Sequence, residues 1–149
     1  MESLWPEDIA VVETKAPVTI LKEQASILGN ETKGTVEGEV AHVLDSSEEL
    51  PFSYAFHIKA PALGDYRYRL FTIAHDVSMY PLLVRPDETT LAELKARKAL
   101  KEFSVDPKGI DVGNERDFVR VLSLLFASRR TKQVVRAILA QSGLSPAAA

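Results

Sequence analysis

The sequence predicts an α+β fold in which one antiparallel sheet carries helices on a single face. Two observations lead to this expectation. From Lys33 to Arg85 the apolar residues alternate with polar ones in the two-residue period of strands, whereas the segments before and after show helical spacing. We therefore expect an N-terminal helix, a sheet of three to five strands, and two or three C-terminal helices packed on one face.

Composition limits the class of protein. The chain has 149 residues, 46% hydrophobic and 26% charged, which suits one globular domain. We expect a single domain over residues 1–149, with residues 1–16 as an extended lead-in and residues 143–149 as a frayed tail. No apolar run approaches the length of about 18 residues that a membrane span needs, and the N-terminus is acidic. We expect a small, bacterial, cytoplasmic protein with no membrane partner.

Two absences in the sequence exclude several kinds of site. The chain contains no cysteine, so disulfides, thiol nucleophiles and zinc sites with Cys ligands are excluded. The seven glycines are scattered, and none of them forms a phosphate-binding loop. We expect no cofactor.

Charge changes sign along the chain. Residues 1–50 hold three Lys or Arg against eleven Asp or Glu, and no acid follows Asp117. This gradient indicates either an anionic partner for the C-terminal part or a contact between the acidic and basic parts, within one chain or between two copies.

The first helix is expected in "PVTILKEQASILGN". Pro17 suits a first helical position, and Gly29 suits a helix end. Val18, Leu21 and Ala25 lie on one face of this helix. In the lead-in before it, "DIAVVE" could add a short edge strand.

Three strands alternate clearly, and a fourth is shorter. They are expected in "TVEGEVAHVL", "FSYAFHIKA", "YRYRLFTIAH" and "YPLLVR". Pro81 favours an edge position for the fourth strand. Strict alternation in the third puts Tyr66, Tyr68, Leu70 and Thr72 on one face, and Arg67, Arg69, Phe71 and Ile73 on the other.

Helices follow the strands. Thr90 stands three residues before Glu93, which is the spacing of a capping box at a helix start. Asn114 is expected to cap a second helix, and Ser128 or Thr131 a third. The "DPKGIDVGN" segment between the first two of these helices is expected to be a loop.

The three histidines are His42, His57 and His75, one in each of three consecutive predicted strands. A metal-assisted hydrolase would need all three rings to converge, but their spacing matches no local metal signature. We predict no metal site, and we keep such a hydrolase only as an alternative.

The pair His75–Asp76 is predicted to be structural. Adjacent side chains of a strand point to opposite faces, and no nucleophile elbow accompanies this pair. Asp76 is expected to accept hydrogen bonds from backbone N–H groups of the following turn. We predict no catalytic residue.

Two basic surfaces are candidates for binding a protein or an anion. Arg67 and Arg69 are expected to face solvent and to reach Glu37 or Glu39 across the sheet. His57 and His75 are candidates for the same open face. The other surface is the last helix, where Arg129, Lys132 and Arg136 are spaced as one stripe and Arg130 lies beside them.

The sequence therefore favours a non-enzymatic module that recognises a protein partner through an open sheet face and charged surfaces, in an accessory, adaptor or immunity role. A homo-oligomer is a further possibility. The alternatives are a nucleic-acid-binding protein that uses the basic C-terminal helix, and the metal-assisted hydrolase that uses the histidines.

Overall fold

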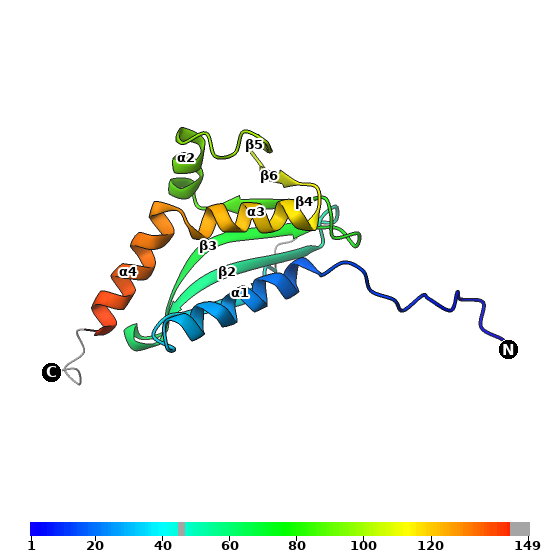
Figure 1. The fold of residues 1–149 in the computed structure, drawn as a ribbon, viewed down its shortest axis with the longest axis horizontal. Helices are drawn as coiled ribbons and strands as arrows, with labels where there is room; N and C mark the ends of the chain where they lie inside the picture. The colour runs from blue at the N-terminus through cyan, green and yellow to red at the C-terminus, as the bar shows by residue number, and fades with distance from the viewer. Residues whose placement is uncertain (45–46, 144–149) are drawn as a thin grey trace.

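The computed structural model describes residues 1–44 and 47–143. Its α+β architecture has one six-stranded antiparallel sheet, ordered β1-β2-β3-β4-β6-β5, with helices on one side (Figure 1). The predicted fold class is confirmed, but the sheet has six strands rather than three to five. The predicted tail from residue 144 onward lies outside the described residues.

The sheet is built in chain order except at its last two strands. β1 to β4 are neighbours in sequence and in space, while β6 pairs with β4 and β5 lies at the edge. The strand bounds are β1 Glu37–His42, β2 Phe52–Ala60, β3 Tyr66–His75, β4 Leu82–Pro86, β5 Ser104–Asp106 and β6 Gly109–Val112. A short 3-10 turn, η1 Pro61–Leu63, joins β2 to β3.

Two expectations for the strands are wrong. The "DPKGIDVGN" segment is part of the β5–β6 hairpin, in which the Asp106 carboxylate accepts hydrogen bonds from the backbone N–H of Lys108 and Gly109. β4 is an interior strand between β3 and β6. Pro81 is compatible with this position because it precedes the first residue of β4 and removes no hydrogen bond from the ladder.

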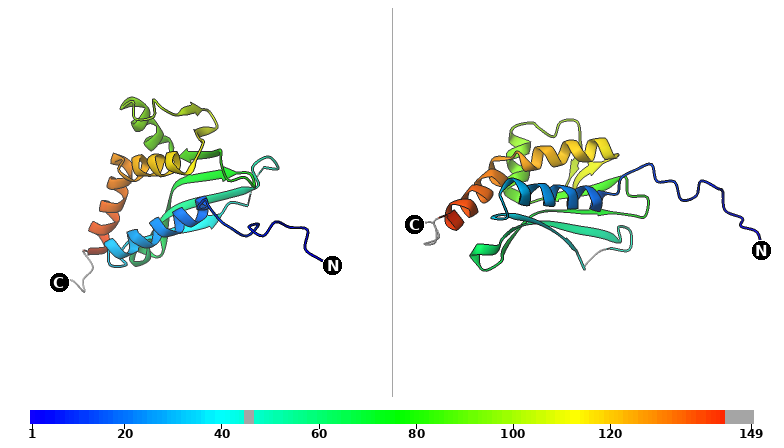
Figure 2. Two further views of the ribbon diagram at one scale, coloured as in Figure 1. Left: turned by 45° about the vertical axis from the view of Figure 1, so that its right-hand side comes forward. Right: turned by 60° about the horizontal axis from the view of Figure 1, so that its bottom comes forward.

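Four α-helices complete the fold of the described residues. α1 and α3 lie side by side across one face of the sheet, and α4 continues from α3 beyond the end of the strands (Figures 1 and 2). Their bounds are α1 Pro17–Glu31, α2 Glu88–Ala96, α3 Glu115–Phe126 and α4 Arg129–Gly143. The lead-in before α1 runs away from the body, and "DIAVVE" joins no strand.

Each C-terminal helix begins at a capping side chain. Asp87 caps α2 by accepting a hydrogen bond from Thr90 N–H at 2.6 Å, so Thr90 is inside the helix rather than at its cap. Asn114 caps α3 as expected, and the Ser128 hydroxyl accepts from Thr131 N–H at the start of α4. Glu93 accepts instead from the backbone N–H groups of Arg129 and Arg130.

The core lies between the sheet and the helices. Its centre is aromatic, with the rings of Phe56 and Phe71 stacked at 5.3 Å and Phe126 tilted against both. The largest side chains with no significant exposure include Phe56, Phe71, Phe118, Leu21, Ile58 and Leu70.

The approach of α1 to β1 depends on Gly38. A Cβ at this position would lie 2.5 Å from the Cα of Ala25 and 2.6 Å from its Cβ. Neither atom can move without moving the helix, so the absent side chain sets the distance between α1 and the first strand.

Gly38→Ala is expected to lower the free energy of unfolding by about 1–3 kcal/mol, because the added methyl group overpacks the contact with the α1 backbone. Urea denaturation measures the change. Gly29→Ala is the matched control, since nothing lies within 4 Å of its new Cβ inside α1. That control should stabilise the protein by up to about 1 kcal/mol. Equal effects of the two substitutions would contradict the packing argument.

Candidate functional site

The sheet face opposite the helices carries a group of charged side chains, which we call the open face. None of the helices in the described part of the chain covers it (Figure 2, right). Strand register places its members in neighbouring rows, with Glu37 beside Lys59 and Arg67, and Glu39 beside His57 and Arg69. Acids from β1 therefore meet bases from β2 and β3.

Glu39 and Arg67 form the best-defined ion pair of this face. Arg67 Nε donates to Glu39 Oε1 at 2.6 Å, and Nη2 donates to Oε2 at 3.2 Å. This two-point hydrogen bond lowers the pKa of the Glu39 carboxyl, with the positive charges of Arg67 and Lys59 adding to the effect. The predicted reach of the arginines to the β1 acids is thus confirmed for Arg67.

His57 and Arg69 lie opposite each other on adjacent strands, and both have unused hydrogen-bonding capacity. Arg69 is exposed and makes no ion pair with any residue that the structure describes. His57 Nδ1 is buried and has no hydrogen-bond partner there. Burial lowers the pKa of His57, and the nearby Arg69 charge lowers it further. The ring is therefore neutral at pH 7.

A bulge in β3 separates His75 from this group. Phe56 pairs with Phe71 and His57 pairs with Arg69, so Leu70 is an extra residue with no partner on β2. Both Leu70 and Phe71 are buried in the core. Beyond the bulge the alternation is reversed, so Phe71, Ile73 and His75 share the helix face with Tyr68. The expectation that they lie with the arginines is wrong.

The three histidines do not converge. His57 lies on the open face, whereas His42 and His75 lie on the helix face, with the Tyr54 ring 4.8 Å from the first and 6.2 Å from the second. Across residues 1–44 and 47–143, no three His, Asp or Glu side chains are arranged to hold a metal ion. The geometry that the hydrolase alternative requires is not present.

The His75–Asp76 pair is arranged as a turn. His75 Nδ1 donates to the backbone oxygen of Asp76 at 2.6 Å, and the Asp76 carboxylate accepts from Ser78 N–H at 2.8 Å. The Asp76 carboxylate therefore binds the backbone of the turn rather than the His75 imidazole, as the sequence predicted.

The four basic residues of the last helix lie in three different places. Arg130 turns toward β3, where its Nε donates to the Tyr68 hydroxyl at 3.1 Å and its guanidinium lies over the Tyr68 ring. Tyr68 in turn donates to Asp87 at 2.5 Å, and burial raises the pKa of its hydroxyl. Lys132 and Arg136 face α1 across a pocket. Arg129 is exposed at the helix start.

One basic member of the open face is not among the candidate binding residues of the sequence analysis. Lys59 pairs in register with both Glu37 and Arg67, and its Nζ lies 3.8 Å from the Asp65 carboxylate. The strict alternation of β2 already places Lys59 on the face of His57.

Comparison with known proteins does not identify a family. No family model, curated protein or solved structure matches the chain. None of the helices in the described part of the chain combines the length and apolar character that crossing a bilayer requires.

Acidification should destabilise the protein through His57. A histidine whose pKa is lower in the folded state than its ordinary value of about 6.5 binds protons more readily when unfolded. Its stabilising contribution is complete above about pH 6.5 and is lost as the pH falls through the lowered pKa of the folded protein.

Denaturant titrations at about pH 7 and about pH 5 test this expectation, since only histidines titrate normally in this interval. His57→Gln should reduce the loss of unfolding free energy between the two pH values. His42→Gln, which changes an exposed histidine, should leave the loss as in the wild type. An unchanged pH dependence in His57→Gln would refute the assignment.

Proposed function

We propose that this protein is a non-enzymatic module that binds a protein partner through the open face, in an accessory, adaptor or immunity role. The observation that supports it most directly is Arg69, which lies opposite His57 on the open face, is exposed, and forms no ion pair with any described residue. A docked carboxylate would pair with its guanidinium.

The mixture of charges on this face favours a protein over a nucleic acid. Glu37 and Glu39 lie in the same rows as Lys59, Arg67 and Arg69, so the basic side chains do not form a continuous positive surface. A phosphate backbone would be repelled by the acids. A protein surface can place complementary charges opposite each row, and this complementarity gives orientation and specificity.

Arginine is also the side chain suited to anchor such a contact. Its planar guanidinium can donate two parallel hydrogen bonds to a carboxylate, and arginines are frequent among the residues that dominate binding energy. Arg67 already makes this type of contact with Glu39, which holds it in place beside Arg69. Arg69 is therefore the proposed anchor, with Arg67 and Lys59 at its side.

Arg69→Glu is expected to weaken partner binding by about tenfold or more, because it replaces the anchor with a repelled charge. Proteins captured from the native source by the immobilised wild type are identified by mass spectrometry and compared with those captured by the variant. The proteins specific to the open face should be lost with Arg69→Glu. Lys101→Glu changes an exposed lysine after α2 and should retain them.

An unchanged set of captured proteins with Arg69→Glu would refute the proposed face. The nucleic-acid alternative is tested with a labelled oligonucleotide at low salt. Binding that weakens steeply with salt and needs Arg129, Lys132 and Arg136 would favour that alternative and count against the proposal.

A further inference from the structure

The helix side of the molecule contains a long groove, which we call the α1 groove. One pocket of about 350 Å³ lies between α1 and α4, and another of about 480 Å³ lies between α1 and α3. Gln24 and Phe126 line both, so the two pockets adjoin along α1. From Ile20 to Glu31 the groove follows α1 for about 17 Å, at 1.5 Å per residue.

The α1 groove is apolar at its floor and basic along one rim. Phe56, Ile58 and Leu70 of the sheet form the floor of the pocket between α1 and α4. Lys132 and Arg136 stand at the α4 rim, and neither forms an ion pair within the described residues. The flanking side chains Ile27 and Val119 are themselves exposed to 44% and 50%. Glu31 lines the same pocket on the α1 side, so the occupant should be elongated and apolar, with its acids on the side that faces α4.

The lead-in of this same chain has that character. Trp5 is 73% exposed, and the other exposed apolar side chains of the segment are Leu4, Ile9, Val11 and Val12. Its acids are Glu2, Glu7, Asp8 and Glu13, and none of them forms an ion pair with any described residue. An extended stretch of about five or six residues matches the groove length at about 3.3 Å per residue.

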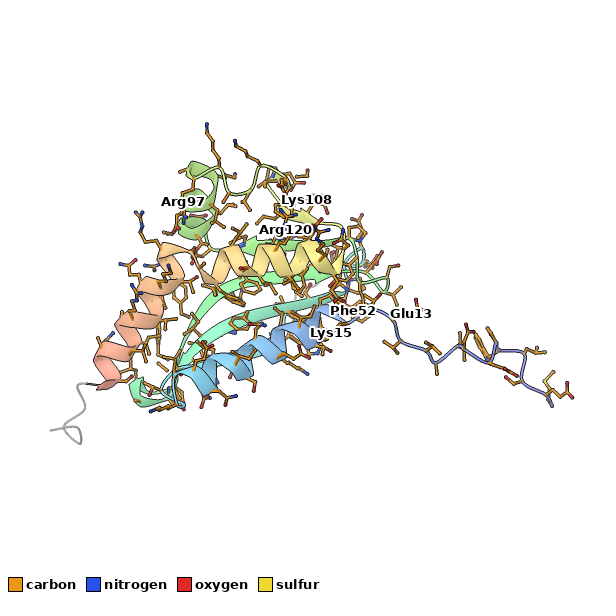
Figure 3. All side chains as sticks on the ribbon, viewed as in Figure 1. Glu13, Lys15, Phe52, Arg97, Lys108 and Arg120 are labelled. Carbon is orange, nitrogen blue, oxygen red and sulfur yellow. The ribbon has the colours of Figure 1, made fainter. Side chains whose placement is uncertain are left out.

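The lead-in is directed away from its own groove. Lys15 holds its end against the body: its backbone N–H donates to Glu115 at 2.8 Å, and its Nζ pairs with Glu23 at 3.0 Å. From Glu13 toward the N-terminus the chain runs away from the body (Figure 3). A return into its own groove would require a reversal directly beside the Lys15 anchor.

We propose that residues 4–9 of one copy occupy the α1 groove of a second copy, with Leu4, Trp5 and Ile9 on its floor and Glu7 and Asp8 beside Lys132 and Arg136. Reciprocal exchange of the two segments gives a closed, two-fold dimer. The proposal uses the side of the sheet opposite to the open face, and so it stands independently of the proposed function.

The properties of the lead-in and those of the α1 groove complement each other. Exposed tryptophan and aliphatic side chains on one segment are unfavourable in water, and the apolar floor of the groove removes them from it. The positive rim explains the choice of an acidic segment over any other apolar peptide. It also agrees with the charge gradient of the sequence, whose acidic and basic ends would meet between two copies.

Trp5 provides the test, because it is the only tryptophan of the chain. Molar mass by light scattering and Trp5 emission are measured together on the full chain from about 1 to about 200 µM. We expect the mass to double as concentration rises, with a parallel shift of the emission to shorter wavelength. Trp5→Ala should weaken dimerisation by about tenfold or more.

Charge reversal identifies the groove. Lys132→Glu with Arg136→Glu, and separately Glu7→Lys with Asp8→Lys, should each weaken the dimer by about tenfold, and all four changes in one chain should restore it. Lys101→Glu with Lys108→Glu is the matched control and should leave dimerisation unchanged. Arg69→Glu should also leave it unchanged, which separates this contact from the open face.

Three results would overturn the proposal. The first is a monomer with the emission of an exposed indole at all concentrations. The second is a monomer whose emission is already shifted at every concentration, which would place the segment in its own groove. The third is a dimer that persists unchanged in the Lys132→Glu, Arg136→Glu variant. Circular dichroism of each variant checks that the fold is retained.

Discussion

The single extra residue at Leu70 decides which side chains of β3 meet the helices and which meet solvent. In a regular strand, burying Leu70 would expose Phe71. The bulge instead points both into the core, where Phe71 stacks on Phe56. The Leu70 backbone oxygen accepts a hydrogen bond from Asp87 N–H, so the segment that starts α2 is attached beside the bulge. The positions of α2, the aromatic core and the open face all depend on this one irregularity.

The bulge also gives β3 two chemically different halves. Before it, Arg67 and Arg69 point away from the helices, while Tyr68 joins Asp87 and Arg130 on the helix side. After it, both faces are nearly apolar, and Ile73 and His75 are buried. The charged side chains that β3 supplies to the open face are therefore confined to its end near η1. Elsewhere on this face, charge comes from the neighbouring strands, with Arg85 of β4 opposite Thr72 and Asp111 of β6 opposite Leu83.

Much of the fold could be predicted because periodicity over six or more residues is hard to misinterpret. β1, β2 and all four helices fall in segments where the pattern is long. β5 and β6 were missed because three and four residues are too few to show a period. The bulge was missed for another reason. Leu70 and Phe71 are both apolar, so either one satisfies a simple alternation, and only contact with the core decides between them.

The candidate surfaces divide in the same way. The Arg67 contact with Glu39 was predictable, since both residues lie in clearly alternating strands. The placement of His75 was not, because it lies beyond the bulge. The α1 groove could not be read from the sequence at all: it combines residues of α1, α3 and α4 with the floor of the sheet, and each contributes an ordinary apolar stripe. Its basic rim was visible in the sequence only as a charged helix face.

Glu93 is a side chain of α2, yet its carboxylate accepts the backbone N–H groups that open α4, 36 and 37 residues further along the chain. Those donors would otherwise be left without partners at the helix terminus. α4 therefore cannot separate from the body without uncovering its own first turn, and unwinding of α2 removes two of the hydrogen bonds that hold α4. The two helices should open as one cooperative unit, with amide protons that exchange together while the sheet stays intact. α4 forms one wall of the α1 groove, and α2 does not line it. The Glu93 carboxylate of α2 nevertheless helps to hold that wall in place.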